Sequence, residues 1–234
     1  MPATYNSETD QYAFLPKQVN WENLLFYKKS LILYDLTFAF VQRFLQRGDR
    51  TIDQMLQAAR SCKQNIVEGL SDGVTSRELE LKLLNVARAS NRELLEDYED
   101  YLRTRHLCHY QRGDQRYDRL YKYCYAHHNP DTYQPFYRQH TDEQLANMAL
   151  TLAYSIDAMM NSFIRQREDL FVREGGIKEQ MTAARLGYRN QQKEIIQQQQ
   201  QTITQLQQTI NHLQQQITQL QQEIEQLKKQ LYNL

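Results

Sequence analysis

The chain has 234 residues, and its 28 Lys and Arg balance 28 Asp and Glu, so the formal net charge at pH 7 is zero. This balance excludes a global field that favours nucleic acid or an anionic membrane, and charge-driven binding has to come from local patches. With only seven Gly and four Pro and few windows that alternate with period 2, an all-α chain is predicted. Three cysteines cannot all pair within the chain, which favours a reducing cytoplasm, and no apolar run approaches the ~20 residues that cross a bilayer.

A polar leader and four amphipathic segments are expected first. Residues 1–19 lack the basic-then-apolar layout of a signal peptide, so we expect a flexible leader. Further on, apolar residues recur three or four positions apart, the pattern of core-facing helices. Gly69 is predicted to cap the C-terminus of the second helix, and Thr75 the N-terminus of the third in a capping box with Glu78. The predicted helices span residues 21–47, 51–68, 75–103 and 141–173.

These four helices favour an up-down four-helix bundle, which we place at residues 20–174. Residues 104–140, between the third and fourth helices, are too many for a simple turn and are expected to form an insertion with a short helix over 116–126. A Gly-Gly hinge and a charged helical linker are expected at 175–195. The predicted fold class is therefore all-α.

Residues 196–234 carry an a/d heptad repeat with almost no interruption. Isoleucine recurs every seven residues at a and leucine at d, which keeps one apolar seam against a partner helix and produces a left-handed supercoil. We therefore expect a parallel coiled coil that makes the chain a homo-oligomer. The residues expected in its interface are Ile196, Ile203, Leu206, Ile210, Leu213, Ile217, Leu220, Ile224, Leu227 and Leu231.

Two helical motifs resemble a known family. They are Ala59-Arg60-Ser61 with Asn65-Ile66-Val67-Glu68-Gly69, and Leu84-Asn85-Val86-Ala87-Arg88-Ala89-Ser90 with Glu93-Leu94. They are similar to motifs of the 23S ribosomal RNA intervening-sequence protein family, the four-helix-bundle suffix-domain proteins that include the accessory variability determinant of diversity-generating retroelements. The resemblance covers roughly residues 20–105 and 141–172. It implies a bundle that assembles as a cyclic pentamer and, in the retroelement members, binds a reverse transcriptase and nucleic acid.

The motif residues could be mistaken for catalytic groups. We expect the small ones to allow close helix packing, and Asn65 and Glu68 to make helix-end hydrogen bonds. No Ser/His/Asp order and no Gly-rich phosphate loop is recognisable, so neither an enzymatic activity nor a cofactor is expected.

The number of chains is open between two arguments. Isoleucine at a with leucine at d favours a parallel dimer, whereas the family resemblance implies five chains. Glutamine and threonine occupy most e and g positions, so charge decides little, and Gln199 at a d position could set the register. We expect a pentamer with a parallel stalk, with a dimer or trimer as alternatives.

Local basic patches are the candidate contacts to nucleic acid. Two Arg pairs are spaced i,i+4, so each pair shares a helix face that a ring would repeat around its axis. In the insertion, Tyr residues alternate with cations, and aromatic rings stack on unpaired bases while Arg binds phosphate. The alternative is that the rings cover the end of the core and the cations solvate it. The candidate residues are Arg43, Arg47, Arg50, Arg60, Lys63, Arg88, Arg92, Arg116, Arg119 and Lys122.

The insertion also holds the weak candidate ligands for zinc, Cys108, His109, Cys124 and His128. Thiolate and imidazole groups bind zinc, although this spacing matches no standard finger. The alternative is an aromatic, polar insertion that packs on the end of the bundle without metal.

Two functions from different classes follow. The leading hypothesis is a cytoplasmic, non-enzymatic oligomer that binds RNA or another nucleic acid, with a reverse transcriptase as a further partner and no membrane contact. The alternative is a structural adaptor that multimerises through the coiled coil and binds protein partners through the insertion. The zero net charge favours the adaptor, and the family resemblance favours the nucleic-acid role.

Overall fold

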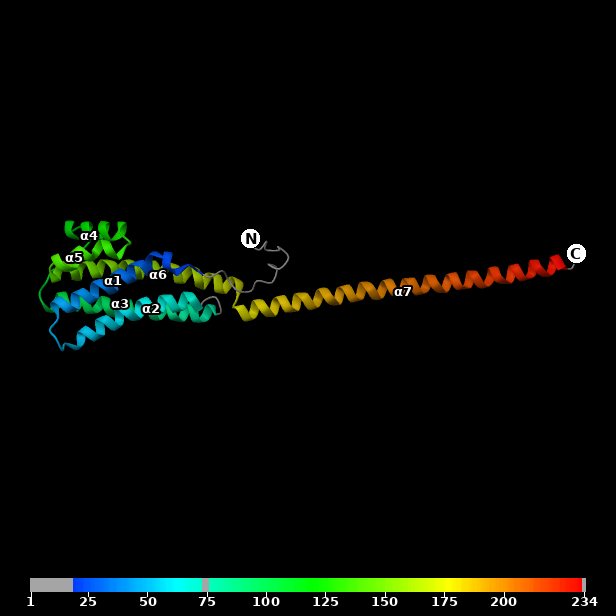
Figure 1. Ribbon diagram of the computed structural model, residues 1–234, viewed down its shortest axis with the longest axis horizontal. Coiled ribbons are helices and arrows are strands. Elements are labelled where there is room, and N and C mark those ends of the chain that lie inside the picture. Colours follow the sequence, from blue (N-terminus) through cyan, green and yellow to red (C-terminus); the bar gives the residue numbers. More distant parts are fainter. Residues whose placement is uncertain (1–18, 73–75, 233–234) are drawn as a thin grey trace, which may run out of the picture. The chain divides into compact units, whose positions relative to one another are not determined.

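The computed structural model describes residues 19–72 and 76–232, without the side chains of 72 and 230–232, so nearly all of the expected leader lies outside it. The regular elements in these ranges are all helical and include no strand, as predicted (Figure 1). None of the described helices combines the length and the apolar character needed to span a bilayer. The chain divides into two compact units, Met1–Gln180 and Met181–Leu234.

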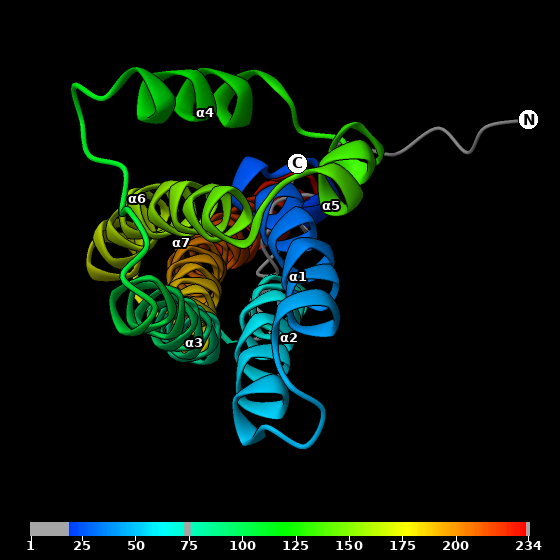
Figure 2. The same cartoon turned by 90° about the vertical axis from the view of Figure 1, so that its left-hand side faces the viewer.

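Four long helices surround the hydrophobic core of the first unit. They are α1 (Leu25–Phe44), α2 (Arg50–Asp72), α3 (Arg77–Thr104) and α6 (Asp142–Glu174). Both α2 and α6 pack against α1 and α3, so each helix has two neighbours, and Figure 2 views them end on. The side chains that repeat three or four positions apart meet inside, and Ile32, Leu36, Phe40, Leu84 and Leu94 are completely buried.

The first two helices differ from their predicted bounds. A short 3-10 helix, η2 (Trp21–Asn23), precedes α1, which ends at Phe44 because Leu45 has extended backbone, with φ −99° and ψ 148°. Gly48 then turns the chain with a φ of 93°, a conformation that favours glycine. The next helix, α2, continues to Asp72, so the predicted C-cap at Gly69 is wrong.

The N-termini of α3 and α6 have side-chain caps. Ser76 is the N-cap of α3, and its hydroxyl accepts a hydrogen bond from the Leu79 amide at 3.2 Å. The predicted capping box with Glu78 is therefore wrong, because the cap lies one residue later than expected, and Thr75 itself lies outside the described residues. At α6, Thr141 forms a complete capping box with Gln144, at the predicted start of the helix.

The insertion consists of three short helices on the α1 and α6 side of the core. They are α4 (Gln115–Ala126), η3 (Pro130–Tyr133) and α5 (Gln134–Gln139). Figure 2 shows α4 over α6 and α5 beside α1, on the opposite side of the unit from α2. Tyr133 and Tyr137 are buried against the core, as the alternative interpretation of the tyrosines expects.

Polar anchors fasten this insertion to the long helices. Lys29 is only 3% exposed, and its ammonium donates to the carbonyls of Cys124 and His127 at the end of α4. Asn147 on α6 accepts from the Tyr110 amide at 2.7 Å and donates to the Cys108 carbonyl at 2.8 Å. These bonds satisfy backbone groups that a loop would otherwise leave without partners.

After α6, one continuous helix forms the rest of the described chain. Gly175 caps α6 with a φ of 70°, and its amide donates to the Phe171 carbonyl at 2.8 Å. The helix α7 (Ile177–Tyr232) follows and has 56 residues, about 84 Å at 1.5 Å per residue. The expected linker and the heptad segment are therefore parts of the same helix, and the five consecutive glutamines at 197–201 do not interrupt it.

Candidate interaction surfaces

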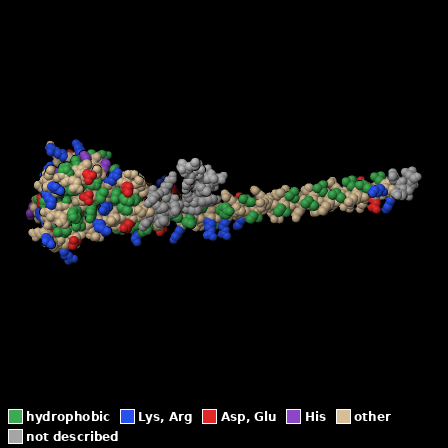
Figure 3. Space-filling view, in the orientation of Figure 1, with side chains coloured by type: hydrophobic (Ala, Val, Ile, Leu, Met, Phe, Trp, Pro, Cys, Tyr) green, Lys and Arg blue, Asp and Glu red, His purple; other side chains and the backbone are tan. Residues whose placement is uncertain are grey.

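The heptad residues form an exposed apolar seam along α7, which we call the α7 seam. Nine of the ten predicted interface side chains, from Ile196 to Leu227, are 47–63% exposed. The tenth, Leu231, belongs to the last turn of α7, where side chains are not described. Hydrophobic side chains recur along this helix in Figure 3. Among the described residues of the second unit, α7 is the only regular element, so no other element described there covers the seam.

The residues beside the α7 seam are polar and uncharged. Threonine hydroxyls at Thr202, Thr204, Thr209 and Thr218 each donate to the carbonyl four residues earlier, at 2.9–3.0 Å. Between residues 195 and 222 there is no Lys, Arg, Asp or Glu. A second copy of the same helix therefore meets no like charge along the seam.

Four of the ten candidate nucleic-acid-binding cations are held by partners within the first unit. Arg43 donates to the carbonyls of Tyr137 and His140, and Lys63 lies 4.4 Å from the centroid of the Tyr34 ring. The two others bind acceptors on α6 and, for Arg116, also the N-cap residue of α4. Arg88 donates to Asn161 Oδ1 at 2.6 Å, and Arg116 pairs with Asp114 at 2.8 Å and Glu143 at 3.5 Å. These contacts position helices and the insertion.

The other six candidates are exposed, and within the described part of the chain they make no hydrogen bond or ion pair through their side chains. They lie on different elements. Arg119 and Lys122 belong to α4, whereas Arg60 is on α2 and Arg92 on α3; Arg47 and Arg50 flank the start of α2. Because α4 and α2 lie on opposite sides of the unit, these cations do not form one patch (Figure 2).

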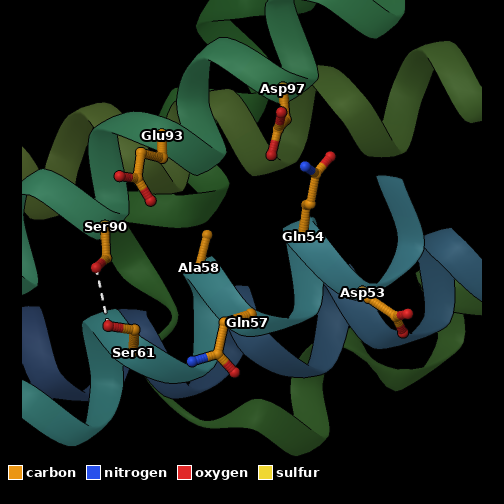
Figure 4. A pocket seen from close by; sticks show the side chains of 8 residues that line it. All are labelled: Asp53, Gln54, Gln57, Ala58, Ser61, Ser90, Glu93 and Asp97. Atoms are coloured by element: carbon orange, nitrogen blue, oxygen red, sulfur yellow. Dashed lines mark hydrogen bonds between the residues drawn. The ribbon is translucent and has the colours of Figure 1, made fainter. Parts of the chain in front are cut away.

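A groove between α2 and α3 is acidic, a feature that the sequence patterns did not predict. It has a volume of about 680 Å³ and is lined by Asp53, Glu93 and Asp97 together with Gln and Ser side chains (Figure 4). Burial, and then the neighbouring charges of Asp100, Glu93 and Glu96, raise the pKa of Asp97 to about 6. The acidic residues of α3 are visible in the sequence, but Asp53 joins them only because α2 packs on α3. This face repels phosphate.

The two family-like motifs meet at one side of this groove. Ser61 and Ser90 share a hydrogen bond of 2.9 Å between α2 and α3, drawn as the dashed line in Figure 4. Asn65 donates to the Ser61 carbonyl and hydroxyl in the middle of α2, so the predicted helix-end role for Asn65 is wrong. At Gly69, a Cβ would lie 3.2 Å from Leu83 Cβ. The motif residues therefore serve close packing of two helices.

Three tyrosines form a ladder on α4, which we define as the partly buried Tyr117 and the exposed Tyr121 and Tyr125. Successive rings stack with centroids 6.1 and 6.2 Å apart, as expected for residues spaced i,i+4 on a helix. Tyr125 is 74% exposed and Tyr121 is 44% exposed. The helix that carries this ladder also carries the exposed cations Arg119 and Lys122.

The four candidate zinc ligands are not brought together. Cys108 is exposed and accepts a hydrogen bond from Arg116 at 3.3 Å, whereas Cys124 is buried on the inner face of α4. Burial raises the pKa of the Cys124 thiol to about 11, which disfavours the thiolate that zinc requires. The described residues contain no group of three or more His, Cys, Asp and Glu side chains placed to hold a metal ion. The predicted site with His109 and His128 therefore does not form.

Comparisons of the chain with family models, with curated proteins and with solved structures find no match. The family resemblance therefore stays a prediction that rests on the two motifs.

Proposed function

We propose that this protein is a non-enzymatic, homo-oligomeric scaffold. In this proposal, α1, α2, α3 and α6 form an up-down four-helix bundle, and α7 forms a parallel coiled coil with other copies of the chain. The main support for this proposal is the α7 seam, in which nine Ile and Leu side chains remain about half exposed on a single helix. The assembly would then present several copies of the bundle and its insertion to protein partners.

The α7 seam would become buried if a second copy of the helix packed against it, and this burial favours association. Covering the exposed half of an Ile or Leu side chain contributes about 1 kcal/mol, and each chain offers nine such positions. The heptad repeat places these side chains opposite their own counterparts in a parallel partner. A seam that is self-complementary in this way favours copies of this chain over an unrelated helix.

Two arguments give different numbers of chains for the proposed assembly. Ile at a and Leu at d favour two chains, and the resemblance to a ring-forming family favours five. Parallel strands suit either number, because a ring of bundles brings all of its tails to one end. The two assemblies differ in mass by whole multiples of the 28.0 kDa chain.

The solution mass of the full chain tests the scaffold. We expect a mass of two or more 28.0 kDa chains for the wild type, and the mass of one chain for the double variant Leu213→Asp with Ile217→Asp, because a buried carboxylate at a and d opposes association. Gln208→Asp with Gln215→Asp is the matched control, since these f positions face away from the seam. A monomeric wild type, or an unchanged mass for the seam variant, contradicts the proposal.

The tyrosine ladder favours a second candidate function, binding of RNA, with a reverse transcriptase as a further partner. Exposed stacked rings next to Arg119 and Lys122 suit unpaired bases and their phosphates. Equilibrium binding to a structured RNA at low and high salt tests it. Tyr121→Ala with Tyr125→Ala is expected to weaken binding at least about thirtyfold, from base stacking of ~1–3 kcal/mol for each of the two rings. Equal affinity of the variant and the wild type excludes this site.

A further inference from the structure

The first turns of the second unit carry three cations on one face of α7. Arg185, Arg189 and Lys193 are spaced by four residues, so their side chains follow one another along the helix surface. We call these three residues the basic stripe. All three are exposed, and within the described residues their side chains form no ion pair and no hydrogen bond.

Nothing nearby on the helix neutralises this charge. No Asp or Glu stands three or four residues before or after any member of the basic stripe, and Glu194 is adjacent to Lys193 on another face. The next 28 residues, 195–222, contain no Lys, Arg, Asp or Glu. Figure 3 accordingly shows Lys and Arg near the start of α7 and again near its far end, with uncharged side chains between. In a chain of zero net charge, this is a local concentration of positive charge.

The heptad register places part of the basic stripe toward the partner helices. When the register of Ile196 is continued toward the N-terminus, Arg189 falls at a and Arg185 at d. In the coiled coil proposed above, guanidinium groups from every chain then face one axis, where they repel one another and lose water. A phosphate bound to the guanidinium groups offsets their mutual repulsion. A dry apolar core is therefore disfavoured here, and a site for negative charge is favoured.

We propose that the basic stripe binds the phosphate backbone of a nucleic acid, with the coiled coil supplying several copies of the stripe; the number of copies rests on the proposed scaffold. Two of the three cations are arginines, whose planar guanidinium binds phosphate with two hydrogen bonds. Asn190, Gln191 and Gln192 lie within the same two turns and add amide donors. This surface is separate from the tyrosine ladder on α4.

An anionic membrane is the less favoured occupant. A helix that lies in a lipid interface needs a continuous apolar face beside its basic face. In this segment Met181, Tyr188 and Ile195 recur only every seven residues, so they supply one apolar side chain per two turns and no continuous apolar face. Leu186 lies on the other side of α7, beside Lys193. The remaining apolar surface is too small to insert into lipid.

Binding of the full chain to a single-stranded RNA oligonucleotide over about 50–200 mM salt tests this inference. We expect Arg185→Gln with Arg189→Gln to lower affinity at least tenfold and to flatten the slope of log K against log salt by about 1.4 or more, from two lost contacts at ~0.7 each. The matched control, Arg165→Gln with Lys229→Gln, removes the same charge from exposed positions elsewhere and is expected to bind within twofold of wild type.

The possible outcomes separate this inference from the scaffold. An oligomeric wild type that binds RNA no better than the stripe variant overturns the inference and leaves the scaffold in place. A monomeric wild type whose binding still depends on Arg185 and Arg189 overturns the scaffold and supports the stripe. If phosphatidylserine vesicles bind the wild type but RNA does not, the occupant is a membrane and the nucleic-acid proposal is wrong.

Discussion

Lys29 shows at the scale of one residue how a buried charge fastens the insertion to the core. Burial lowers the pKa of its ammonium, and the carbonyls of Cys124 and His127 accept its hydrogen bonds. These two carbonyls lie at the C-terminus of α4, where a positive charge is favoured by the helix dipole. The ammonium thus satisfies backbone acceptors that water would otherwise have to reach.

Replacement of Lys29 by Met is expected to loosen the insertion. The variant keeps the apolar stem but leaves two carbonyl groups without their donor, at a cost of about 1–3 kcal/mol in the free energy of unfolding. Urea denaturation followed by tyrosine fluorescence measures this loss. Lys28→Met, the adjacent and less buried position, is the control and is expected to change the free energy by less than about 0.5 kcal/mol.

Asp97 predicts a dependence of stability on pH. Its pKa is raised to about 6 by burial and by Asp100, Glu93 and Glu96, so the folded state binds its proton more tightly than the unfolded state. The stability that this proton contributes is complete below the ordinary pKa of 3.8 and is lost as pH rises through about 6.

Asp97→Asn is therefore expected to stabilise the protein at pH 7 by about 0.5–1 kcal/mol, because it relieves two like-charge pairs at i−4 and i+3. The difference between variant and wild type is expected to shrink as pH falls from 7 to 5. Thermal unfolding at both pH values gives this difference, with Glu168→Gln on the exposed face of α6 as the control. A constant difference would contradict the assignment.

At the scale of elements, the α2–α3 pair depends on small residues at its contact. The Ser61–Ser90 hydrogen bond and the absence of a side chain at Gly69 bring the two helices close. An alanine Cβ at Gly69 would lie 3.2 Å from Leu83 Cβ and 3.3 Å from the Glu80 carbonyl oxygen, and backbone has little room to move. The gain in helix propensity from Gly to Ala is about 1 kcal/mol and opposes this strain.

We expect the strain to exceed the propensity gain, so that Gly69→Ala lowers the free energy of unfolding by about 1 kcal/mol. Gly187→Ala on α7 is the matched control, since its Cβ would meet nothing within 4 Å. That variant is expected to stabilise its helix by up to about 1 kcal/mol. Circular dichroism during heating measures both, and stabilisation by both variants would show that α3 can move aside.

At the scale of the whole molecule, the two compact units predict two unfolding steps. The first unit has its own hydrophobic core, whereas α7 in the second unit carries an exposed seam that the proposed coiled coil would bury. The step that belongs to the coiled coil is expected to shift to lower temperature over about a hundredfold dilution, because association obeys mass action, whereas the step of the first unit is expected to stay constant. The Leu213→Asp and Ile217→Asp variant is expected to lose the concentration-dependent step alone.

Periodicity in the sequence was sufficient for the long helices, because it reports which face of a helix is apolar without knowledge of the partner. Helix ends were predicted less well. The Gly69 cap and the box of Thr75 with Glu78 failed because local cap preferences compete with packing of α2 on α3, which a single segment does not reveal. The acidic groove was missed for the same reason, since Asp53 and Asp97 are 44 residues apart in sequence and meet only across that contact.

The sequence by itself determined the helical class, the heptad seam of α7 and the contrast between its basic stripe and the uncharged run at 195–222. These features depend on residue order along one helix, and local spacing is sufficient to establish them. Only the tertiary structure decided which cations are held by partners, that Cys124 is buried away from Cys108, and that Lys29 anchors the end of α4. Those outcomes depend on contacts between segments distant in the chain, where burial and neighbouring charge set the energy of each group.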